Sequence, residues 1–424
     1  MNKKGFTLVE LLAVIAILAI LVIIALPNVI KLYNNAKKNT FLTEARTIYK
    51  EAANKYITES MKGNKVTYIS SNTKNSLELN GSKDIEYKIR LNSDGSVRRF
   101  QIKNNSYCIN GKYNDESELV IDDVTENECA KINATYCNSN LDKLEIGSEV
   151  VIGKYTYKYK QGYGDLGWSN LKDDGWGVVL TNKESTDEIT EVPCTYIDNK
   201  PIIAMGYAFK DSKAKNIDLS GINTSHVIDM NFMFGRTSAS TLNLIDFDTS
   251  NVKNLGMRQM FNGAKATVVY GLEYFDTSKI TNTNWMFCGT KISNLDLSNF
   301  DTSNVTNMGW MFVNIKNPSI DITPLDTSKV TSMRGMFQDT STKIIGIEKL
   351  DTSAVTNMGW MFRGNGSSIL DLSSFDTTNV TVIDSMFAES SVKTIYVRSD
   401  EDIEKFKSSS DIPDGIEFIN VNKK

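Results

Sequence analysis

The sequence predicts an α+β chain made of a long transmembrane N-terminal helix, a small β-rich head, and an α/β solenoid of stacked repeats. An apolar run near the N-terminus, alternating apolar and polar residues in the middle, and a 25-residue segment recurring in the second half support this prediction. The expected domains are a leader (1–5), a hydrophobic and amphipathic helix (6–62), a β-rich globular part (63–141), a β-rich connecting and capping region (142–190), the repeats (191–397) and a C-terminal cap (398–424).

Composition argues against several classes of function. One histidine in 424 residues leaves too few imidazoles for a Ser-His-Asp or Cys-His nucleophile, or for a zinc site with two His ligands. The net charge of −4 provides no basic excess for binding phosphate, so nucleic acid is not an expected partner. Catalysis by carboxylates or lysines stays formally open. The expectation is no enzyme activity, no catalytic residue, no metal and no cofactor.

Residues 6–26 form an apolar run with only two polar side chains. As a helix rising about 1.5 Å per residue, this run would span roughly 31 Å, which is enough to cross one bilayer. Lys3 and Lys4 precede the run, so the positive-inside rule places the N-terminus in the cytoplasm and everything after Pro27 outside. The sequence therefore predicts a single-pass membrane protein that is mostly extracellular.

Glu10 is unusual in such a helix, because a lone charge there costs about 2.5–3.5 kcal/mol. The residues around it, KKGFTLVE at 3–10, resemble the processing and methylation motif of type IV prepilins. The resemblance implies cleavage between Gly5 and Phe6, N-methylation of Phe6, and pairing of Glu10 with the free amine of a neighbouring subunit. Pro27 falls where the family's helix commonly kinks. An unprocessed membrane anchor remains the alternative.

The same resemblance implies partners and location. A prepilin peptidase and other pilin subunits are the expected partners, together with the membrane through residues 6–26. The chain would lie in the cell membrane before assembly, and on the cell surface or in a pilus after processing.

Beyond Pro27 the helix is expected to continue to about Gly63, because apolar residues recur every three or four positions at 41, 45, 48, 52 and 56. Two alternating segments, 85–91 and 96–102, flank an Asn-Ser-Asp-Gly turn and predict a β-hairpin.

Five cysteines lie on the expected outer side of the membrane, where disulfides persist. Cys108 and Cys129 are the expected pair, since the first flanks a strand and the second ends the same segment, although spacing alone does not define connectivity. Cys288 occupies a repeat position that holds other residue types in the remaining copies, and it is expected to be unpaired.

The repeat is clearest in LDLSNFDTSNVTNMGWMF, residues 295–312. With the Asp or Asn before Thr-Ser or Thr-Thr as the marker, copies begin at 223, 248, 276, 301, 326, 351 and 376. Each copy is expected to form a strand, a turn and about two helical turns. Val305, Met308 and Phe312 then share one helix face, and stacking of the copies joins these faces into a core.

The pattern D-T-S-x-V-T-x-M-x-x-M-F resembles the 25-residue class of BspA-like leucine-rich-repeat surface proteins over roughly 191–397. The resemblance implies an extracellular interaction scaffold with adhesive members and no catalysis. A methionine-rich metal box is the alternative for the recurring methionines, but their repeat positions favour core packing. A calcium ladder is not favoured, because each repeat supplies too few oxygen ligands.

Nine residues after the marker, three copies hold Trp285, Trp310 and Trp360, whereas others hold Gly335 or Ser385. On a helix this position points away from the core, so the three indoles would form an exposed row that binds a partner. In the alternative interpretation, each indole covers the neighbouring repeat and seals the stack.

The sequence thus predicts a surface-displayed type IV pilin-like subunit that presents its repeats for adhesion to an extracellular protein or a host surface. A minor or tip location is expected, because about 200 residues of solenoid would be hard to pack at every position of a fibre. The alternative is a pseudopilin of a secretion or DNA-uptake system whose solenoid binds cargo.

Overall fold

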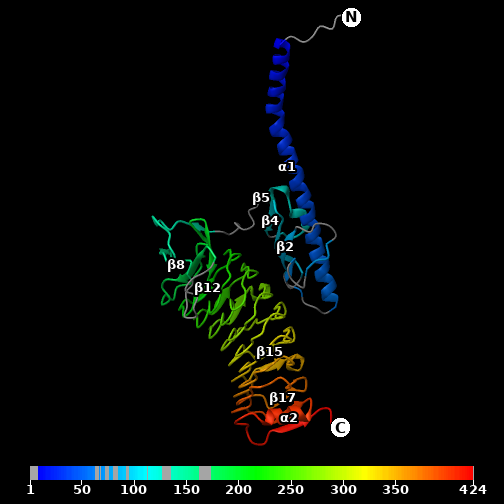
Figure 1. Cartoon of the computed structure of the whole chain (residues 1–424), viewed down its shortest axis with the longest axis vertical. Helices are drawn as coiled ribbons and strands as arrows, with labels where there is room; N and C mark the ends of the chain where they lie inside the picture. The colour runs from blue at the N-terminus through cyan, green and yellow to red at the C-terminus, as the bar shows by residue number, and fades with distance from the viewer. Residues whose placement is uncertain are drawn as a thin grey trace. The chain divides into compact units, whose positions relative to one another are not determined.

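The computed structural model describes residues 8–62, 66, 68–71, 76–79, 85–91, 95–111, 113–126, 135–161 and 173–423. The chain divides into two compact units, Met1–Cys129 and Ala130–Lys424 (Figure 1). The second unit begins before the expected domain boundary at residue 141. The reason is that β6 (Tyr136–Cys137) pairs with β10 (Tyr196–Ile197) of the second unit.

The first unit is built on α1 (Leu8–Met61), a helix of 54 residues. The apolar stripe predicted from the sequence faces the core of this unit, where Phe41, Ala45, Ile48 and Ala52 are buried. Nearer the N-terminus the large apolar side chains Leu26, Val29, Ile30, Leu32 and Tyr33 are exposed. Most side chains of the predicted 6–26 span lie outside the described part. Among the described residues, no helix has the length and apolar character needed to cross a bilayer.

A five-stranded antiparallel sheet packs on α1. Its strands, in spatial order, are β1 (Tyr68–Ser70), β2 (Glu86–Leu91), β3 (Val97–Lys103), β4 (Tyr107–Gly111) and β5 (Thr125–Glu126). The predicted hairpin is confirmed, because β2 and β3 pair with Ile89 opposite Phe100, and both side chains are fully buried. Tyr49 of α1 donates a hydrogen bond of 2.8 Å to the carbonyl of Tyr113, so the helix also has a polar contact with the segment that follows β4.

The second unit begins with a six-stranded sheet. Its strands are β6, β7 (Glu149–Ile152), β8 (Tyr155–Tyr159), β9 (Trp176–Leu180), β10 and β11 (Lys200–Ala204), in the spatial order β6-β10-β11-β9-β8-β7. Tyr157 and Trp176 are fully buried in a core that continues into the repeats. Tyr155 packs edge-on against Phe209 with 6.2 Å between ring centroids. We call residues 138–193 the N-terminal cap, because their strands β7, β8 and β9 belong to this sheet and Tyr155 and Leu180 contact the first coil at Phe209 and Ala208.

The repeats form a solenoid whose coils stack one after another (Figure 1). The described strands that line one side are β12 (Asn216–Asp218), β13 (Thr241–Asn243), β14 (Val268–Tyr270), β15 (Ser319–Asp321), β16 (Lys343–Ile345), β17 (Ile369–Leu372), β18 (Thr394–Val397) and β19 (Glu417–Asn420). Paired strands in this set are parallel and in register. One phenylalanine per coil stacks on the next, with centroids 5.5–6.1 Å apart from Phe209 to Phe387. The repeated phenylalanine of each copy thus forms one continuous column in the core of the solenoid.

The expected helical turns within each repeat are wrong. Val305, Met308 and Phe312 are fully buried as predicted, but the segment that carries them is a series of turns. The N–H groups of Met308, Trp310 and Phe312 donate to carbonyls of the next coil at 2.8–3.1 Å, so they cannot form helical hydrogen bonds. Trp310 has φ of 55°, which a right-handed helix does not allow. The described repeats form a β solenoid with turns instead of the α/β solenoid expected from the leucine-rich-repeat resemblance.

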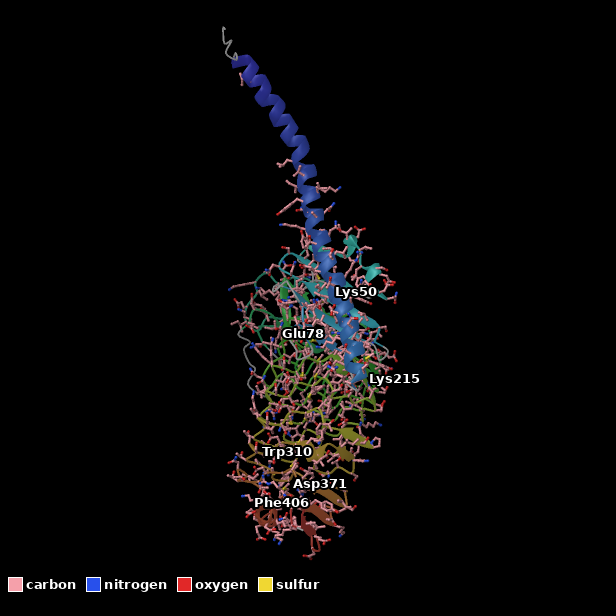
Figure 2. The ribbon with its side chains drawn as sticks, turned by 90° about the vertical axis from the view of Figure 1, so that its right-hand side faces the viewer. Lys50, Glu78, Lys215, Trp310, Asp371 and Phe406 are labelled. Atoms are coloured by element: carbon pink, nitrogen blue, oxygen red, sulfur yellow. A yellow bond between two sulfur atoms is a disulfide. The ribbon has the colours of Figure 1, made fainter. Side chains whose placement is uncertain are left out.

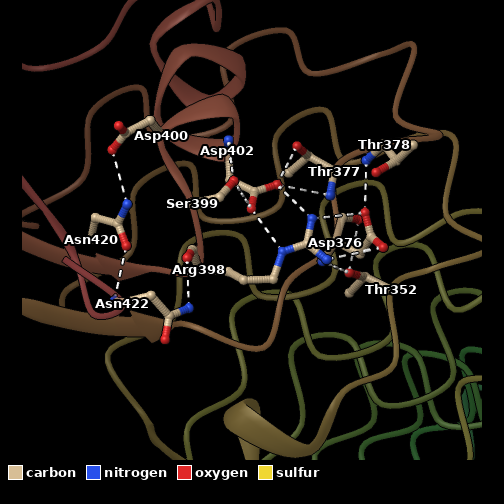
Figure 3. Close-up of polar contacts among 10 residues, drawn as sticks. All are labelled: Thr352, Asp376, Thr377, Thr378, Arg398, Ser399, Asp400, Asp402, Asn420 and Asn422. Atoms are coloured by element: carbon tan, nitrogen blue, oxygen red, sulfur yellow. Dashed lines mark hydrogen bonds and ion pairs between the residues drawn. The ribbon is translucent and has the colours of Figure 1, made fainter.

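The C-terminal tail closes the solenoid with α2 (Asp400–Lys407) and β19. Arg398 joins this cap to the last coil, because its guanidinium contacts Asp376 at 3.1 Å and Asp402 at 2.9 Å (Figure 3). The hydrogen bonds from Arg398 lower the pKa of Asp376. Burial opposes ionisation of Asp402, but hydrogen bonds from Thr377, Ser399 and Arg398 outweigh it and lower the pKa. The cap is therefore held by paired charges as well as by apolar contacts.

Candidate functional site

Several of the predicted site residues lie outside the part of the chain that the structure describes. Gly5 and Phe6 are among them, so cleavage and methylation there stay predictions. Glu10 and Pro27 lie on the described backbone of α1, but their side chains do not belong to the described part. Cys108 is disulfide-bonded. Cys129 is outside the described residues, so the pairing of these two cysteines also stays a prediction.

The three predicted indoles occupy the same place in successive turns of the solenoid. Trp285, Trp310 and Trp360 all have a left-handed backbone, with φ between 55° and 63°. Residues other than glycine lose about 1–2 kcal/mol in that conformation. Gly335 has the same conformation in its own coil, with φ of 61°, so this turn does not itself require tryptophan. The indoles are present despite this backbone preference, which means that their contacts compensate for it.

Trp285 and Trp310 stack on each other, with centroids 5.1 Å apart and planes 12° from parallel. On the following coil, Trp310 lies directly over Gly335, where a Cβ atom would come within 2.4 Å of the indole. The lack of a side chain at Gly335 therefore provides the space that the Trp310 indole occupies. Figure 2 shows Trp310 between Lys215, near the start of the solenoid, and Asp371, near its end.

Arginines continue the row. The guanidinium of Arg334 lies 5.8 Å from the Trp310 ring and 4.8 Å from the Trp360 ring, within cation–π range of both. The guanidinium of Arg363 also lies over the Trp360 ring, 5.2 Å from its centroid. These five side chains are half-buried, so each has a face or an edge in contact with solvent. We call Trp285, Trp310, Arg334, Trp360 and Arg363 the aromatic–arginine strip.

Ion pairs hold the arginines of the strip. Arg334 binds Asp384, two coils further along, through two hydrogen bonds of 3.0 and 3.1 Å. This pairing lowers the pKa of Asp384. The pair crosses Gly359, where a Cβ atom would lie 2.5–2.6 Å from the charged atoms. Arg363 pairs with Glu389 at 2.6 Å.

The geometry of the strip agrees in part with each interpretation of the three tryptophans, as a binding row and as side chains that seal the stack. The stacked faces seal neighbouring coils, while the half-exposed edges remain accessible to a partner. Arg334 and Arg363 were not predicted from the sequence. Arg334 directly precedes Gly335, and Arg363 follows Trp360 by three residues. The sequence shows an arginine near a recurring aromatic position in these two copies. That the guanidinium groups contact indole rings is seen only in the folded structure.

A second missed feature is the disulfide between Cys137 and Cys194, whose Cα atoms are 6.0 Å apart. The bond joins the expected β-rich head, which holds Cys137, to the expected repeats, which hold Cys194. Cys288 has a free thiol, as expected, and burial raises its pKa to about 11. The thiol is therefore protonated at neutral pH and is not an activated nucleophile.

The described part of the chain contains no cluster of three or more His, Cys, Asp or Glu side chains that could hold a metal ion. His226 is half-buried beside Tyr196, whose hydroxyl lies 3.3 Å from Nδ1. Burial lowers the pKa of His226, so the imidazole is neutral at pH 7.

Comparison with known families gives two matches. The prokaryotic N-terminal methylation motif matches residues 1–26. The family described as "Mycoplasma protein of unknown function, DUF285" matches three overlapping segments, 184–268, 255–343 and 310–412. Together these segments extend over 184–412, which is more than half of the chain. No match was found among curated proteins or among solved structures.

Proposed function

The chain belongs to the DUF285 family and carries a prepilin methylation motif, and from these premises we propose that it is a minor or tip-located type IV pilus subunit displaying its solenoid for adhesion. The motif indicates a type IV pilin-like surface protein that is processed by a prepilin peptidase and assembles with other pilin subunits. The proposed role of the solenoid is binding without catalysis.

The aromatic–arginine strip is the observation that supports adhesion. Tryptophan and arginine are the side chains most enriched among residues that dominate binding energy, and here they occur together on rigid, stacked coils. The strip occupies a turn position that glycine would fill with less backbone strain, as Gly335 does. A partner of the strip would be a protein or glycan on a host surface or in its matrix.

The first test replaces Trp310 with Gly, because Gly335 shows that the same turn accepts glycine. We expect attachment of the pilus-bearing cells to host cells and matrix to weaken by about 2 kcal/mol, which is roughly 30-fold in affinity. Thermal unfolding of the purified chain is measured in parallel. Tyr270→Ser is the matched control, since Tyr270 is 49% exposed on β14 and does not belong to the strip.

Two results would count against adhesion through the strip. One is unchanged attachment by a Trp310→Gly variant that is present in fibres at the wild-type level. The other is a loss of attachment that simply follows a large loss of thermal stability, because the indole would then belong to the stack alone. Shearing the cells tests the location: a pilus subunit leaves with the fibres at low stoichiometry, whereas a pseudopilin of a secretion system stays with the envelope.

A further inference from the structure

Near the beginning of the second unit, the short segment 135–137 is hydrogen-bonded to residues 195–198 at the start of the solenoid. The carbonyl of Thr135 accepts hydrogen bonds from the N–H groups of Thr195 and Tyr196 at 2.9 and 3.1 Å. The N–H of Asp198 donates to the carbonyl of Cys137 at 3.1 Å. Tyr136 also stacks on Tyr196, with 4.9 Å between centroids. Residues 135–137 are thus attached to residues 195–198.

The Cys137–Cys194 disulfide makes this attachment covalent. The two cysteines are 57 positions apart, so the bond encloses the 56 residues 138–193. This enclosed segment is the N-terminal cap with β7, β8 and β9. A path along covalent bonds from residue 137 to residue 194 can therefore bypass the whole cap.

The cap protects the first coil. The N–H of Leu180 donates to the carbonyl of Ala208 at 2.9 Å, and the N–H of Cys194 donates to the hydroxyl of Tyr157 at 2.8 Å. Tyr155 covers Phe209, the first ring of the phenylalanine column, and Phe209 is fully buried. If the cap were pulled away, this end of the column would be exposed to water, which is unfavourable for a solenoid end.

Tension reaches the second unit at its N-terminal side whenever the first unit is held and the solenoid is bound elsewhere. Without the disulfide, the attachment would depend on the two-residue strand β6 and a few hydrogen bonds. Once these break, the load would run through residues 138–193 and peel β7, β8 and β9 from the first coil.

We propose that the Cys137–Cys194 disulfide is a load-bearing shortcut that carries tension directly into the solenoid and keeps the N-terminal cap out of the force path. The inference goes beyond the proposed function, which supplies only a source of tension, a fibre at one end and a bound surface at the other. Disulfides persist outside the cell, so the shortcut suits a surface protein.

The test is a single-molecule pulling experiment on the full chain in detergent, with DNA handles joined to peptide tags at the two ends. The oxidised wild type is compared with the Cys137→Ser/Cys194→Ser double variant. We expect the variant to show an early lengthening of about 190 Å, since 56 residues extend by about 3.3–3.6 Å each, before the coils unfold. The wild type should lack this early step. Cys108→Ser is the control, because Cys108 is a disulfide-bonded residue of the first unit that takes no part in the Cys137–Cys194 bond. Like the wild type, it should lack the early step.

If the double variant unfolds in the same order and at the same forces as the wild type, the proposal is wrong. It is equally wrong if the oxidised wild type loses the cap before the coils. Should the double variant not fold, reductant is added to folded molecules of the wild type and of Cys108→Ser that are held in the trap. Both should then show the early step. In Cys108→Ser molecules this step cannot come from reduction of a disulfide at Cys108. Neither fibres nor a binding partner are needed, so failure here is distinct from failure of the adhesion test.

Discussion

At the scale of single residues, Asp229 departs from the pattern of its neighbours. In three of the other coils this position holds Asn282, Asn307 or Asn357, whose side-chain oxygen accepts the N–H two residues later at 2.8–3.1 Å. Asp229 makes the same hydrogen bond at 2.8 Å but carries a carboxylate. Its side chain is buried, with 3% exposed, and burial raises its pKa to about 6. The coil of Asp229 therefore contains a destabilising charge at neutral pH.

We expect Asp229→Asn to stabilise the chain at pH 7 by about 2–3 kcal/mol, because a two-unit pKa shift corresponds to that free energy. The raised pKa means that the folded state binds the proton more tightly than the unfolded state, whose reference value is 3.8. The penalty is therefore absent below about pH 4, grows as pH rises to about 6, and is complete above that value. Urea unfolding of the wild type and of Asp229→Asn at pH 4.5 and pH 7 measures this penalty.

The comparison variant for this charge is Asn307→Asp, which places a carboxylate at the equivalent, half-buried position of another coil. Because this position is more exposed than Asp229, the variant should lose less stability between pH 4 and 6. If the pH dependence of the free energy of unfolding is identical in wild type and Asp229→Asn, the carboxylate is better solvated than its burial indicates.

At the scale of one coil, Gly359 illustrates how the stack constrains its members. The Arg334–Asp384 pair passes over this residue, and a methyl group there would overlap with both charged groups. We expect Gly359→Ala to cost about 1–3 kcal/mol through displacement of the pair. The cost should shrink in an Arg334→Met background, because the clash is then relieved, and a double-mutant cycle measured by urea unfolding gives the coupling.

Gly309 provides the control within the same column. Its equivalent contacts are wider, at 3.1–3.2 Å, and the three nearest atoms belong to uncharged amide and carbonyl groups. Gly309→Ala should therefore cost less than Gly359→Ala and should show no coupling to Arg334→Met. Equal costs at the two glycines would show that the ion pair does not determine which residue fits at position 359.

At the scale of the whole molecule, the N-terminal motif predicts a mature chain that begins with N-methylated Phe6. Mass spectrometry of protein from sheared fibres measures this directly. Gly5→Trp should leave unprocessed protein in the membrane, because a bulky residue replaces the glycine that precedes the cleavage site. Normal fibres that contain this variant would contradict the predicted processing.

Assembly provides a second prediction at this scale. Glu10→Gln should enter the membrane at least as well as wild type, because the substitution removes a charge that costs about 2.5–3.5 kcal/mol on insertion. It should nevertheless be absent from fibres, since the amine of the neighbouring subunit loses its partner. Quantifying the variant in membrane and sheared fractions, with Thr7→Ser, three positions earlier in the sequence, as a control, separates insertion from assembly. Equal incorporation of Glu10→Gln and wild type would assign the charge another role.

Much of the fold could be predicted from the sequence, but the conformation of the repeats could not. Spacings of 3, 4 and 7 correctly identified Val305, Met308 and Phe312 as core residues, yet the same spacings suggested a helix. The structure satisfies the backbone differently, since alternate N–H groups donate to the next coil. A periodicity shows which residues are buried, whereas the hydrogen-bonding partner of the backbone depends on the coil stacked beside it.

The candidate site shows the same division. The recurring tryptophans are visible in the sequence because the period is regular. Arg334, Gly335 and Gly359 acquire their roles only from neighbours about 25 or 50 positions away, such as Trp310 and Asp384. Cation–π contacts, ion pairs and steric limits depend on distances of a few ångströms, which spacing along one chain does not specify.

By itself, the sequence determined the prepilin motif, the buried stripe of α1, the hairpin of β2 and β3, and the period and core positions of the repeats. These features are local or periodic, so hydrophobic patterning is enough to identify them. Only the tertiary structure decided that the coils are β in character, that Cys137 joins Cys194, and that Arg334 contacts the rings of both Trp310 and Trp360. Each of these depends on groups that meet because the chain folds back on itself, and the free energy of such contacts appears only when the coils are stacked.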